Sequence, residues 1–401
     1  MAKVIMHIDL NAFFASCEVI RDPSLAGLPL LIGHTGRSGI VSTASYEARA
    51  YGCHSGQPMF QALRLCPKAK VIPVDYDYYS MMSLSFFSYL KRFTLLVEPA
   101  SIDEGFADMS EAVKGKEDPE SFFRSLQSEL KKETGLGCSI GVAPTKWLAK
   151  MASDLKKPMG LTILRKKDIP NLLYPLPIES FWGVGKKTSP RLREMGIASI
   201  GDFAQALLRG DQNVEKELGK FALTAKEWIQ GYGSDRVSPL EEDPKSIGAQ
   251  ETLAKDCQTY EEVELYFSRL AEEISSRCLS AGKEARSLTV SVKTLDFRLH
   301  SRAMPFAEPT RSSVLIKEKA KEGFRALMDR LGDPKIRQVG IALTRLVDPQ
   351  RETVQMSLWN YQDYERKDAT KLLIEELNRK MDKPMLKRAS QAEKGKKNGN
   401  R

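Results

Sequence analysis

Two short acidic stretches, each at the end of an apolar, strand-like run, constrain this fold more than any other feature of the sequence. Residues 7–14 contain Asp9, and residues 101–106 contain Asp103 and Glu104. Burying several carboxylates beside apolar side chains is costly unless a positive charge neutralises them. We therefore expect the fold to bring the two stretches together around a bound cation.

The chemistry of the donors predicts which cation. Oxygen ligands on a rigid scaffold suit Mg²⁺, which prefers carboxylates, waters and substrate phosphates. Asp9, Asp103 and Glu104 suffice for a two-metal site of the kind used in nucleotidyl transfer. Taken alone, each stretch also fits a turn at a strand end followed by a helix cap. Their joint occurrence in one basic chain favours the metal site.

Composition limits the classes of protein. The chain has 401 residues, a net charge of +9 and a pI near 9.1, which favours two to four domains and a polyanionic partner. Its six cysteines include no C-x-x-C pair and it has four histidines, so we expect neither a zinc site nor a disulfide framework. No apolar run matches a membrane span or a signal peptide. We expect a cytoplasmic protein without a membrane partner.

Hydrophobic periodicity predicts an α+β fold in the first half of the chain. Strands are expected at residues 3–8, 95–108 and 137–142, and helices at residues 11–20, 76–93, 121–133 and 146–155. The Gly-rich residues 27–73 predict a small α/β insertion with short strands near 30–32 and 39–42 and a helical turn at 46–50.

Residues 178–203 predict a helix-hairpin-helix unit. Gly183 and Gly185 would form a turn that exposes backbone N–H groups to a DNA phosphate, and Lys186 and Lys187 follow directly. Arg191 and Arg193 add further charge. A glycine-capped turn between two helices with a solvated basic face is the alternative.

After a linker at residues 231–245, the pattern predicts a second α+β unit. Helices are expected at residues 260–279 and 312–331 among strands at 287–294, 298–305 and 337–346. A sheet of four strands with two helices would present basic residues to a duplex backbone. These residues are Lys293, Arg298, Arg302, Arg337 and Arg345.

These blocks together resemble the Y family of DNA polymerases, and within it the DinB type. The resemblance rests on residues 7–14, Tyr46-Glu47-Ala48-Arg49, Ser101-Ile102-Asp103-Glu104 and Lys156-Lys157-Pro158, and runs from residue 3 to about 348. It implies an error-prone, template-directed DNA polymerase that adds dNTPs to a primer 3′-end in translesion synthesis and DNA repair, without a proofreading exonuclease.

The resemblance also implies an α+β multidomain fold shaped like a right hand. The expected parts are a palm (1–12 and 76–164), fingers (13–75), a helix-hairpin-helix thumb (165–232), a linker (233–245), a little finger (246–348) and a clamp-binding and basic tail (349–401).

Site residues follow from the resemblance position by position. Two Mg²⁺ ions would be held by Asp9, the Leu10 carbonyl, Asp103 and Glu104. The nucleotide would contact Phe13, Phe14, Thr43, Tyr46, Arg49 and Lys157, with Phe14 as the steric gate against ribonucleotides. An ion pair with Glu47 or nearby acids is the alternative for Arg49. Asn11 stands where many members carry Asp, and Met159 where Asn or Asp is usual.

The expected partners are primer–template DNA, dNTPs and a sliding clamp, and we expect a monomer. Gln355, Leu358 and Trp359 resemble the bacterial clamp-binding pentapeptide, with an edge strand as the alternative. Three other functions fit the sequence less well. A nucleotidyl cyclase would need no steric gate or helix-hairpin-helix. A non-catalytic repair factor would not need the acids and the basic residues together, which are Asp9, Asp103, Glu104, Arg49 and Lys157. An exported nuclease would need an export signal and a histidine base.

Overall fold

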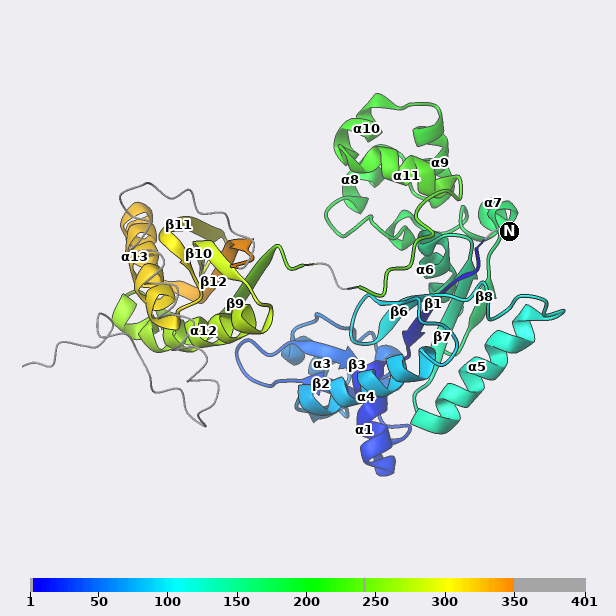
Figure 1. Ribbon diagram of the computed structural model, residues 1–401, viewed down its shortest axis with the longest axis horizontal. Coiled ribbons are helices and arrows are strands. Elements are labelled where there is room, and N and C mark those ends of the chain that lie inside the picture. The colour runs from blue at the N-terminus through cyan, green and yellow to red at the C-terminus, as the bar shows by residue number, and fades with distance from the viewer. Residues whose placement is uncertain (1–2, 241–242, 350–401) are drawn as a thin grey trace, which may run out of the picture. The chain divides into compact units, whose positions relative to one another are not determined.

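The computed structural model describes residues 3–240 and 243–349 and divides the chain into two compact units, Met1–Asp243 and Pro244–Arg401 (Figure 1). The predicted clamp-binding residues Gln355, Leu358 and Trp359 lie outside the described residues. No helix in the described ranges combines the length and apolarity that crossing a bilayer requires.

The first unit is built on a five-stranded sheet of order β5-β6-β1-β7-β8. The strands are β1 (Ile5–Leu10), β5 (Val97–Pro99), β6 (Glu104–Asp108), β7 (Cys138–Ala143) and β8 (Leu161–Ile163). β1 lies in the middle and is antiparallel to both β6 and β7. The sequence predicted the acidic residue Asp9 just after the first strand, whereas β1 continues through Leu10. It missed β8, which is too short to give a periodic signal.

Helices cover both faces of this sheet. One face packs against α1 (Phe13–Arg21), α4 (Tyr76–Leu90) and α5 (Pro119–Thr134), and the other against α6 (Lys146–Asp154). Side chains alternate along a strand, so Met6, Ile8 and Leu10 enter the first core while His7 and Asp9 face α6. α6 approaches closely because β7 has Gly141 there: a Cβ would lie 2.1 Å from the carbonyl oxygen of Ala149.

A smaller three-stranded sheet of order β3-β2-β4 occupies the predicted insertion. Its elements are η1 (Pro23–Leu25), β2 (Leu30–Gly33), β3 (Val41–Ala44), α2 (Tyr46–Arg49), α3 (Met59–Leu65) and β4 (Lys70–Ile72). Ser45 caps α2 by accepting a hydrogen bond from the N–H of Ala48. This cap fixes where the predicted phosphate-binding turn begins.

A helical region follows the main sheet. It comprises η2 (Lys166–Asp168), α7 (Ile169–Leu172), η3 (Ile178–Ser180), α8 (Ser189–Glu194), α9 (Ile200–Leu208), α10 (Gln212–Leu218) and α11 (Phe221–Ile229). Its core is continuous with that of α6, because the ring of Trp228 stacks on both Trp147 and Trp182. The first helix of the predicted helix-hairpin-helix is only the 3₁₀ turn η3.

Part of the predicted linker is bound to the main sheet. The backbone N–H of Ser238 donates to Glu98 at 2.8 Å, and the same carboxylate accepts from Lys146 of α6. Val237 is buried in the core shared with α6. The residues before Leu240 therefore follow the surface of the first unit.

The second unit is a four-stranded antiparallel sheet of order β11-β10-β12-β9, with two helices on one face. The elements are β9 (Ser246–Cys257), α12 (Tyr260–Ser280), β10 (Glu284–Thr294), β11 (Leu299–Thr310), α13 (Ser313–Leu331) and β12 (Ile336–Val347). Leu288, Val290 and Val292 of β10 enter the core with the helices. The opposite, open face carries the alternate residues, among them Thr289 and Ser291.

Candidate active site

The two acidic stretches meet because β1 and β6 are neighbours. Asp9 lies directly opposite Glu104 in the strand register, and the N–H of Leu10 donates to the backbone oxygen of Asp103 at 2.9 Å. The Asp103 carboxylate accepts from Ser101 Oγ at 2.6 Å in the loop before β6. The fold thus places the two acidic stretches that the sequence singled out side by side.

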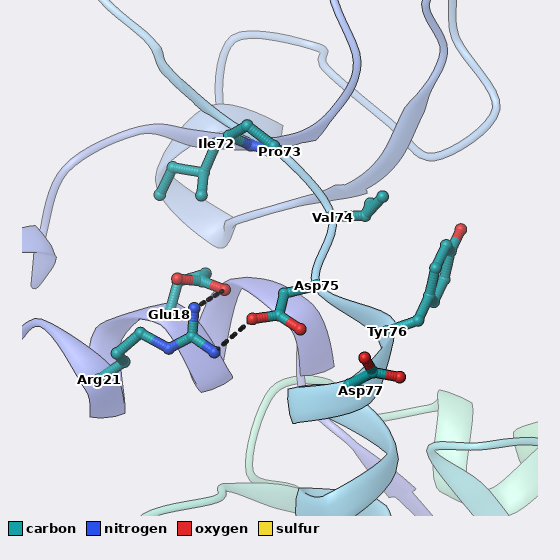
Figure 2. A pocket seen from close by; sticks show the side chains of 8 residues that line it. All are labelled: Glu18, Arg21, Ile72, Pro73, Val74, Asp75, Tyr76 and Asp77. Atoms are coloured by element: carbon teal, nitrogen blue, oxygen red, sulfur yellow. Dashed lines mark hydrogen bonds and ion pairs between the residues drawn. The ribbon is translucent and has the colours of Figure 1, made fainter. Parts of the chain in front are cut away.

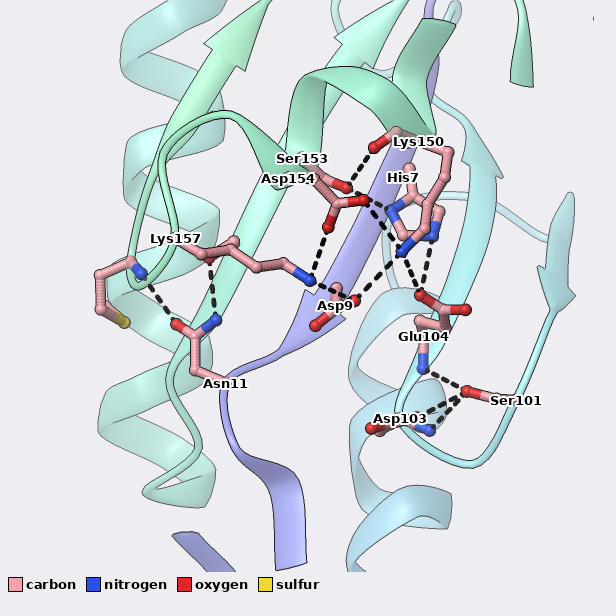
Figure 3. A network of polar contacts seen from close by, with 12 residues as sticks. His7, Asp9, Asn11, Ser101, Asp103, Glu104, Lys150, Ser153, Asp154 and Lys157 are labelled. Atoms are coloured by element: carbon pink, nitrogen blue, oxygen red, sulfur yellow. Dashed lines mark hydrogen bonds and ion pairs between the residues drawn. The ribbon is translucent and has the colours of Figure 1, made fainter. Parts of the chain in front are cut away.

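Two lysines pair with the half-buried carboxylates of Asp9 and Glu104 (Figure 3). Lys157 Nζ lies 2.7 Å from Asp9 Oδ2. Lys150 Nζ, from α6, lies 2.7 Å from Glu104 Oε2 and 3.4 Å from Asp9 Oδ2. The sequence predicted Lys157 as a contact of the nucleotide, not as a partner of Asp9, and missed Lys150. A lysine within the apolar stretch Trp147-Leu148-Ala149-Lys150-Met151 was the available signal.

A fully buried histidine lies behind Glu104. His7 Nδ1 contacts Ser153 Oγ at 2.8 Å, and its ring packs 4.8 Å from the ring of Phe106. His7 Nε2 lies 3.4 Å from Glu104 Oε2, longer than an ordinary N–H···O hydrogen bond. His7 therefore supports the acidic cluster from the side of α6.

Burial and these charges shift the pKa values in different directions. Burial raises the pKa of Asp9, against the opposing effect of Lys157. The His7 ring and the Lys150 ammonium lower the pKa of the Glu104 carboxyl, and burial lowers the pKa of His7. For Lys150, burial works to lower the pKa, but the surrounding carboxylates outweigh it and the pKa is raised. These directions favour the charged forms of Glu104 and Lys150 and the neutral form of the His7 imidazole.

The donor set suits a hard divalent cation, because Asp9, Asp103, Glu104 and the Leu10 carbonyl all offer oxygen. In their present rotamers the Asp9 and Glu104 carboxylates turn to the two lysines. Accordingly, no group of three His, Cys, Asp or Glu side chains in residues 3–240 and 243–349 is arranged as a metal cage.

A cavity of about 320 Å³ lies beside the acids. Its wall on the main sheet includes Asp9, Leu10, Asp103 and Lys157, and its opposite wall includes Phe13, Phe14, Thr43, Tyr46 and Arg49. Glu104 is not part of the lining. All of the predicted metal- and nucleotide-binding residues except Glu104 therefore line this one cavity.

Phe14 is held at the edge of this cavity by aromatic contacts. Its ring stacks on that of Tyr79 with centroids 4.3 Å apart and an angle of 14°, and meets Tyr76 edge-on at 6.0 Å. The Tyr79 hydroxyl donates to the buried carboxylate of Glu18 at 2.8 Å. Phe13 is 2% exposed and belongs to the core.

The cationic wall is formed by α2. The Arg49 guanidinium lies 4.8 Å from the centroid of the Tyr46 ring, one helical turn away. Arg49 Nε donates to the carbonyl oxygen of Ala44 at 2.9 Å, so the predicted alternative of an ion pair with Glu47 is not adopted. This leaves Arg49 exposed towards the cavity it lines.

A second, more open cavity of about 620 Å³ lies between α1 and the start of α4 (Figure 2). Its one basic lining residue, Arg21, pairs with Asp75 at 2.8 Å and with Glu18 at 3.8 Å. Asp77 adds a further acid to the lining. This excess of negative charge disfavours a polyanionic nucleotide.

The predicted phosphate-binding residues of the helix-hairpin-helix divide into two groups. Lys186 and Lys187 are exposed, next to Gly183 and Gly185 in the turn before α8. Arg191 pairs with Glu217 and Arg193 with Glu179, each at 2.7 Å or less. Charge available to a phosphate is therefore concentrated on the two lysines.

The basic residues predicted in the second unit do not form one row. Lys293 lies on the open face opposite Gln338, whereas Arg302 lies opposite the buried Val290 and points to the helical side of the edge strand. In the hairpin between β10 and β11, Arg298 pairs with Asp296 at 3.1 Å. The Arg337 guanidinium packs on the ring of Phe297, 4.1 Å from its centroid.

Family models match three parts of the chain. They are the impB/mucB/samB family over residues 8–154, the HHH motif of the IMS family over residues 166–197 and the impB/mucB/samB family C-terminal domain over residues 244–358. Together they cover both units.

Curated relatives match over nearly the whole chain. The chain is 36% identical over 392 residues to DNA polymerase IV of Bacillus velezensis, covering 97% of this chain and 93% of that protein. It is 35% identical over 398 residues to DNA polymerase IV 1 of Bacillus subtilis, covering 98% and 94%.

Solved structures agree. A Y-family DNA polymerase chimera, Dbh-Dpo4(243-245)-Dbh, has a TM-score of 0.77 at 28% identity and covers 86% of this chain and 99% of that one. An insertion ternary complex of Dbh DNA polymerase has a TM-score of 0.58 at 28% identity, with coverages of 86% and 99%. The chain therefore belongs to the impB/mucB/samB family and is a Y-family DNA polymerase of the DNA polymerase IV type.

Proposed function

We propose that this polymerase extends primers at the cavity between Asp9 and Arg49, using Asp9, Asp103 and Glu104 as its catalytic carboxylates. The observation that carries the proposal is the shared cavity, whose one wall is acidic and whose other wall is cationic and aromatic. Members of the family carry out template-directed, translesion DNA synthesis.

Y-family polymerases use divalent metal ions, and we propose two Mg²⁺ ions here, held by Asp9, Asp103, Glu104 and the Leu10 carbonyl. When bound, such ions stabilise the charge that develops on the attacking and leaving oxygens. The carboxylates supply the fixed negative charge that holds them. Lys150 then offsets the remaining charge of the cluster from α6.

The cationic wall suits a triphosphate. Arg49 presents a fork of N–H donors suited to phosphate oxygens, and Lys157 adds a point charge. Tyr46 and Thr43 offer hydroxyl groups on the same wall. We propose that these four side chains bind the dNTP phosphates while the acids bind the metal ions.

Phe14 would select the sugar. Its ring cannot move away from the cavity easily, because Tyr79 and Tyr76 pack against it. A rigid ring under the sugar leaves no room for a 2′-hydroxyl. Small residues such as Ser42, which also lines the cavity, would place little steric constraint on the geometry of the new base pair. Such weak discrimination is consistent with error-prone synthesis.

Two surfaces would hold the duplex through its phosphates. In the first unit, Lys186 and Lys187 flank the exposed turn at Gly183 and Gly185. In the second unit, the open sheet face carries small and hydroxyl-bearing side chains, with Lys293 as its cation. Contacts of this type are sequence-independent and weaken with salt. Arg298, Arg302 and Arg337 complete the proposed DNA-binding set.

Three further proposals concern the protein in the cell. Gln355, Leu358 and Trp359 would dock to a sliding clamp, the polymerase would act as a monomer, and it would work in the cytoplasm. A clamp pull-down with and without residues 355–359, and sedimentation of the purified chain, test the first two.

Primer extension with Mg²⁺ tests the active site. Wild type, Asp103→Ala and Phe14→Ala are compared with dNTPs and with rNTPs on intact and abasic templates. Asp103→Ala should abolish extension while primer–template binding persists, and Phe14→Ala should gain rNTP incorporation. Phe14→Tyr, which keeps the ring, is the matched control and should still exclude rNTPs.

Two outcomes would contradict the proposal. Wild-type protein that binds primer–template tightly without extending it would instead be a DNA-binding scaffold. Extension that survives Asp103→Ala would place the catalytic carboxylates elsewhere.

A further inference from the structure

The loop that carries Lys157 is held by Asn11, a side chain to which the proposed function gives no role (Figure 3). Asn11 follows β1 directly and is 6% exposed. Its Nδ2 donates to Ser139 Oγ at 2.8 Å, and its Oδ1 accepts from the backbone N–H of Met159 at 2.8 Å. Because a backbone N–H only donates, the orientation of the amide is fixed by its partners.

Met159 has an unfavourable backbone conformation, which the hydrogen bond from its N–H to Asn11 stabilises. Its φ of +59° lies in the left-handed region, which residues bearing a Cβ rarely adopt unless they are Asn or Asp. The turn is also tight, since a Cβ at Gly160 would lie 1.8 Å from the carbonyl oxygen of Lys156. The Asn11 amide thus binds the turn at Met159, the residue with the left-handed backbone conformation.

This turn determines where Lys157 reaches. Lys157 precedes Met159 by two residues, and its Nζ lies 2.7 Å from Asp9 Oδ2 and 2.8 Å from Asp154 Oδ1. Asp9 and Asn11 are themselves two residues apart. One short segment therefore provides both the carboxylate that faces Lys157 and the amide that holds its loop.

We propose that Asn11 is a positioning residue for the incoming dNTP. By holding the backbone at Met159, it fixes the direction from which the Lys157 ammonium enters the cavity. The inference rests on the proposed contact between Lys157 and the triphosphate, and Asn11 itself touches neither the nucleotide nor the metal ions.

Single-nucleotide incorporation by full-length variants tests this role. Asn11→Ala should raise KM for dNTP about three- to tenfold, the effect of losing one hydrogen bond, and change kcat less. The double variant Asn11→Ala/Lys157→Ala should be no worse than Lys157→Ala alone, because the first residue acts through the second. Asn11→Asp, which keeps the acceptor for the Met159 N–H, is the conservative control and should stay near wild type.

A second measurement needs no nucleotide. Hydrogen exchange of residues 156–160 should become faster in Asn11→Ala and not in Asn11→Asp. Met159→Asn, added to Asn11→Ala, should reverse part of the increase in KM, since asparagine tolerates the left-handed conformation. If Asn11→Ala does not fold, Asn11→Ser serves, because its side chain is shorter than the amide that bonds Met159.

The outcomes separate the two claims. A raised KM in Lys157→Ala with a normal KM in Asn11→Ala overturns the positioning role, as do additive effects in the double variant or unchanged exchange. An unchanged KM in Lys157→Ala overturns the proposed triphosphate contact, and with it the effect of Asn11 on the nucleotide.

Discussion

Replacing Lys150 by methionine tests the charge balance of the acidic cluster around Asp9 and Glu104. The substitution keeps an unbranched apolar side chain that is one atom shorter, and it removes the ammonium with its charge and its hydrogen bonds. Lys150 is 13% exposed, and its Nζ lies 2.7 Å from Glu104 Oε2 and 3.4 Å from Asp9 Oδ2. In metal-free protein, Lys150→Met leaves Asp9 paired with Lys157 and removes the lysine partner of Glu104.

The cost follows from these distances. At an effective dielectric constant of about 20, each contact is a gross attraction of about 5–6 kcal/mol, most of which desolvation offsets. Removing one partner of a buried ion pair costs about 3–5 kcal/mol. Because Lys150 and Glu104 keep some exposure, we expect about 3 kcal/mol, or a Tm lower by about 6–12 °C for a unit of this size.

The pH dependence has a definite sign. The pKa of Glu104 is lowered in the folded protein, so its contribution to stability is present above the unfolded pKa and is lost as pH falls through the folded pKa. Lys150→Met raises that folded pKa towards the unfolded value. The two proteins should therefore differ most near neutral pH and converge in acid.

Thermal unfolding in EDTA and in excess Mg²⁺ provides the assay. Mg²⁺ should restore most of the Tm lost by Lys150→Met, because a divalent cation replaces the missing charge. Lys146→Met is the matched control. Lys146 is on the same helix as Lys150, but its Nζ lies 2.6 Å from Glu98 of β5 and not at Asp9 or Glu104. A wild-type Tm for Lys150→Met in EDTA, or equal Mg²⁺ rescue of both variants, would refute the reasoning.

Three further predictions concern packing and reactivity. Gly141→Ala should lower the free energy of unfolding by about 1–3 kcal/mol, since the new Cβ would press against the backbone of α6. Gly185→Ala is the control and should not change the Tm, because no atom lies within 4 Å of its new Cβ. Equal Tm shifts in the two variants would contradict the close packing of α6 on Gly141. Tyr79→Phe leaves the buried Glu18 carboxylate without its hydroxyl donor and should lower the free energy of urea unfolding by about 1–3 kcal/mol. Burial raises the pKa of Cys17 to about 12, so its thiol should resist a disulfide reagent near pH 8 until urea unfolds the protein; rapid labelling of native protein would contradict this burial.

Local patterns in the sequence were sufficient to predict the main elements and the acids. The apolar runs that end near Asp9 and Asp103 are strands of one sheet, and the helices expected around residues 76–93, 121–133 and 146–155 are α4, α5 and α6. The element ends shifted by a few residues. Short pieces such as β4, β8 and α3 were missed, because three to seven residues carry too little periodicity.

Such local patterns could not predict which residues far apart in the sequence become neighbours in space. Lys150 reaches the carboxylates of Asp9 and Glu104 because Gly141 lets α6 lie directly on β7. Asn11 and Met159, the two positions noted as departures from the family pattern, share a hydrogen bond that no spacing suggests.

The sequence by itself determined the family and the positions of the acids, of the proposed steric gate and of the cationic turn, because each lies in a contiguous motif with its own chemistry. Only the tertiary structure decided which charges balance those acids. Neutralisation of a buried carboxylate depends on distances of a few ångströms between separate elements, and these distances are set by how α6 and the loop at Lys157 pack on the sheet.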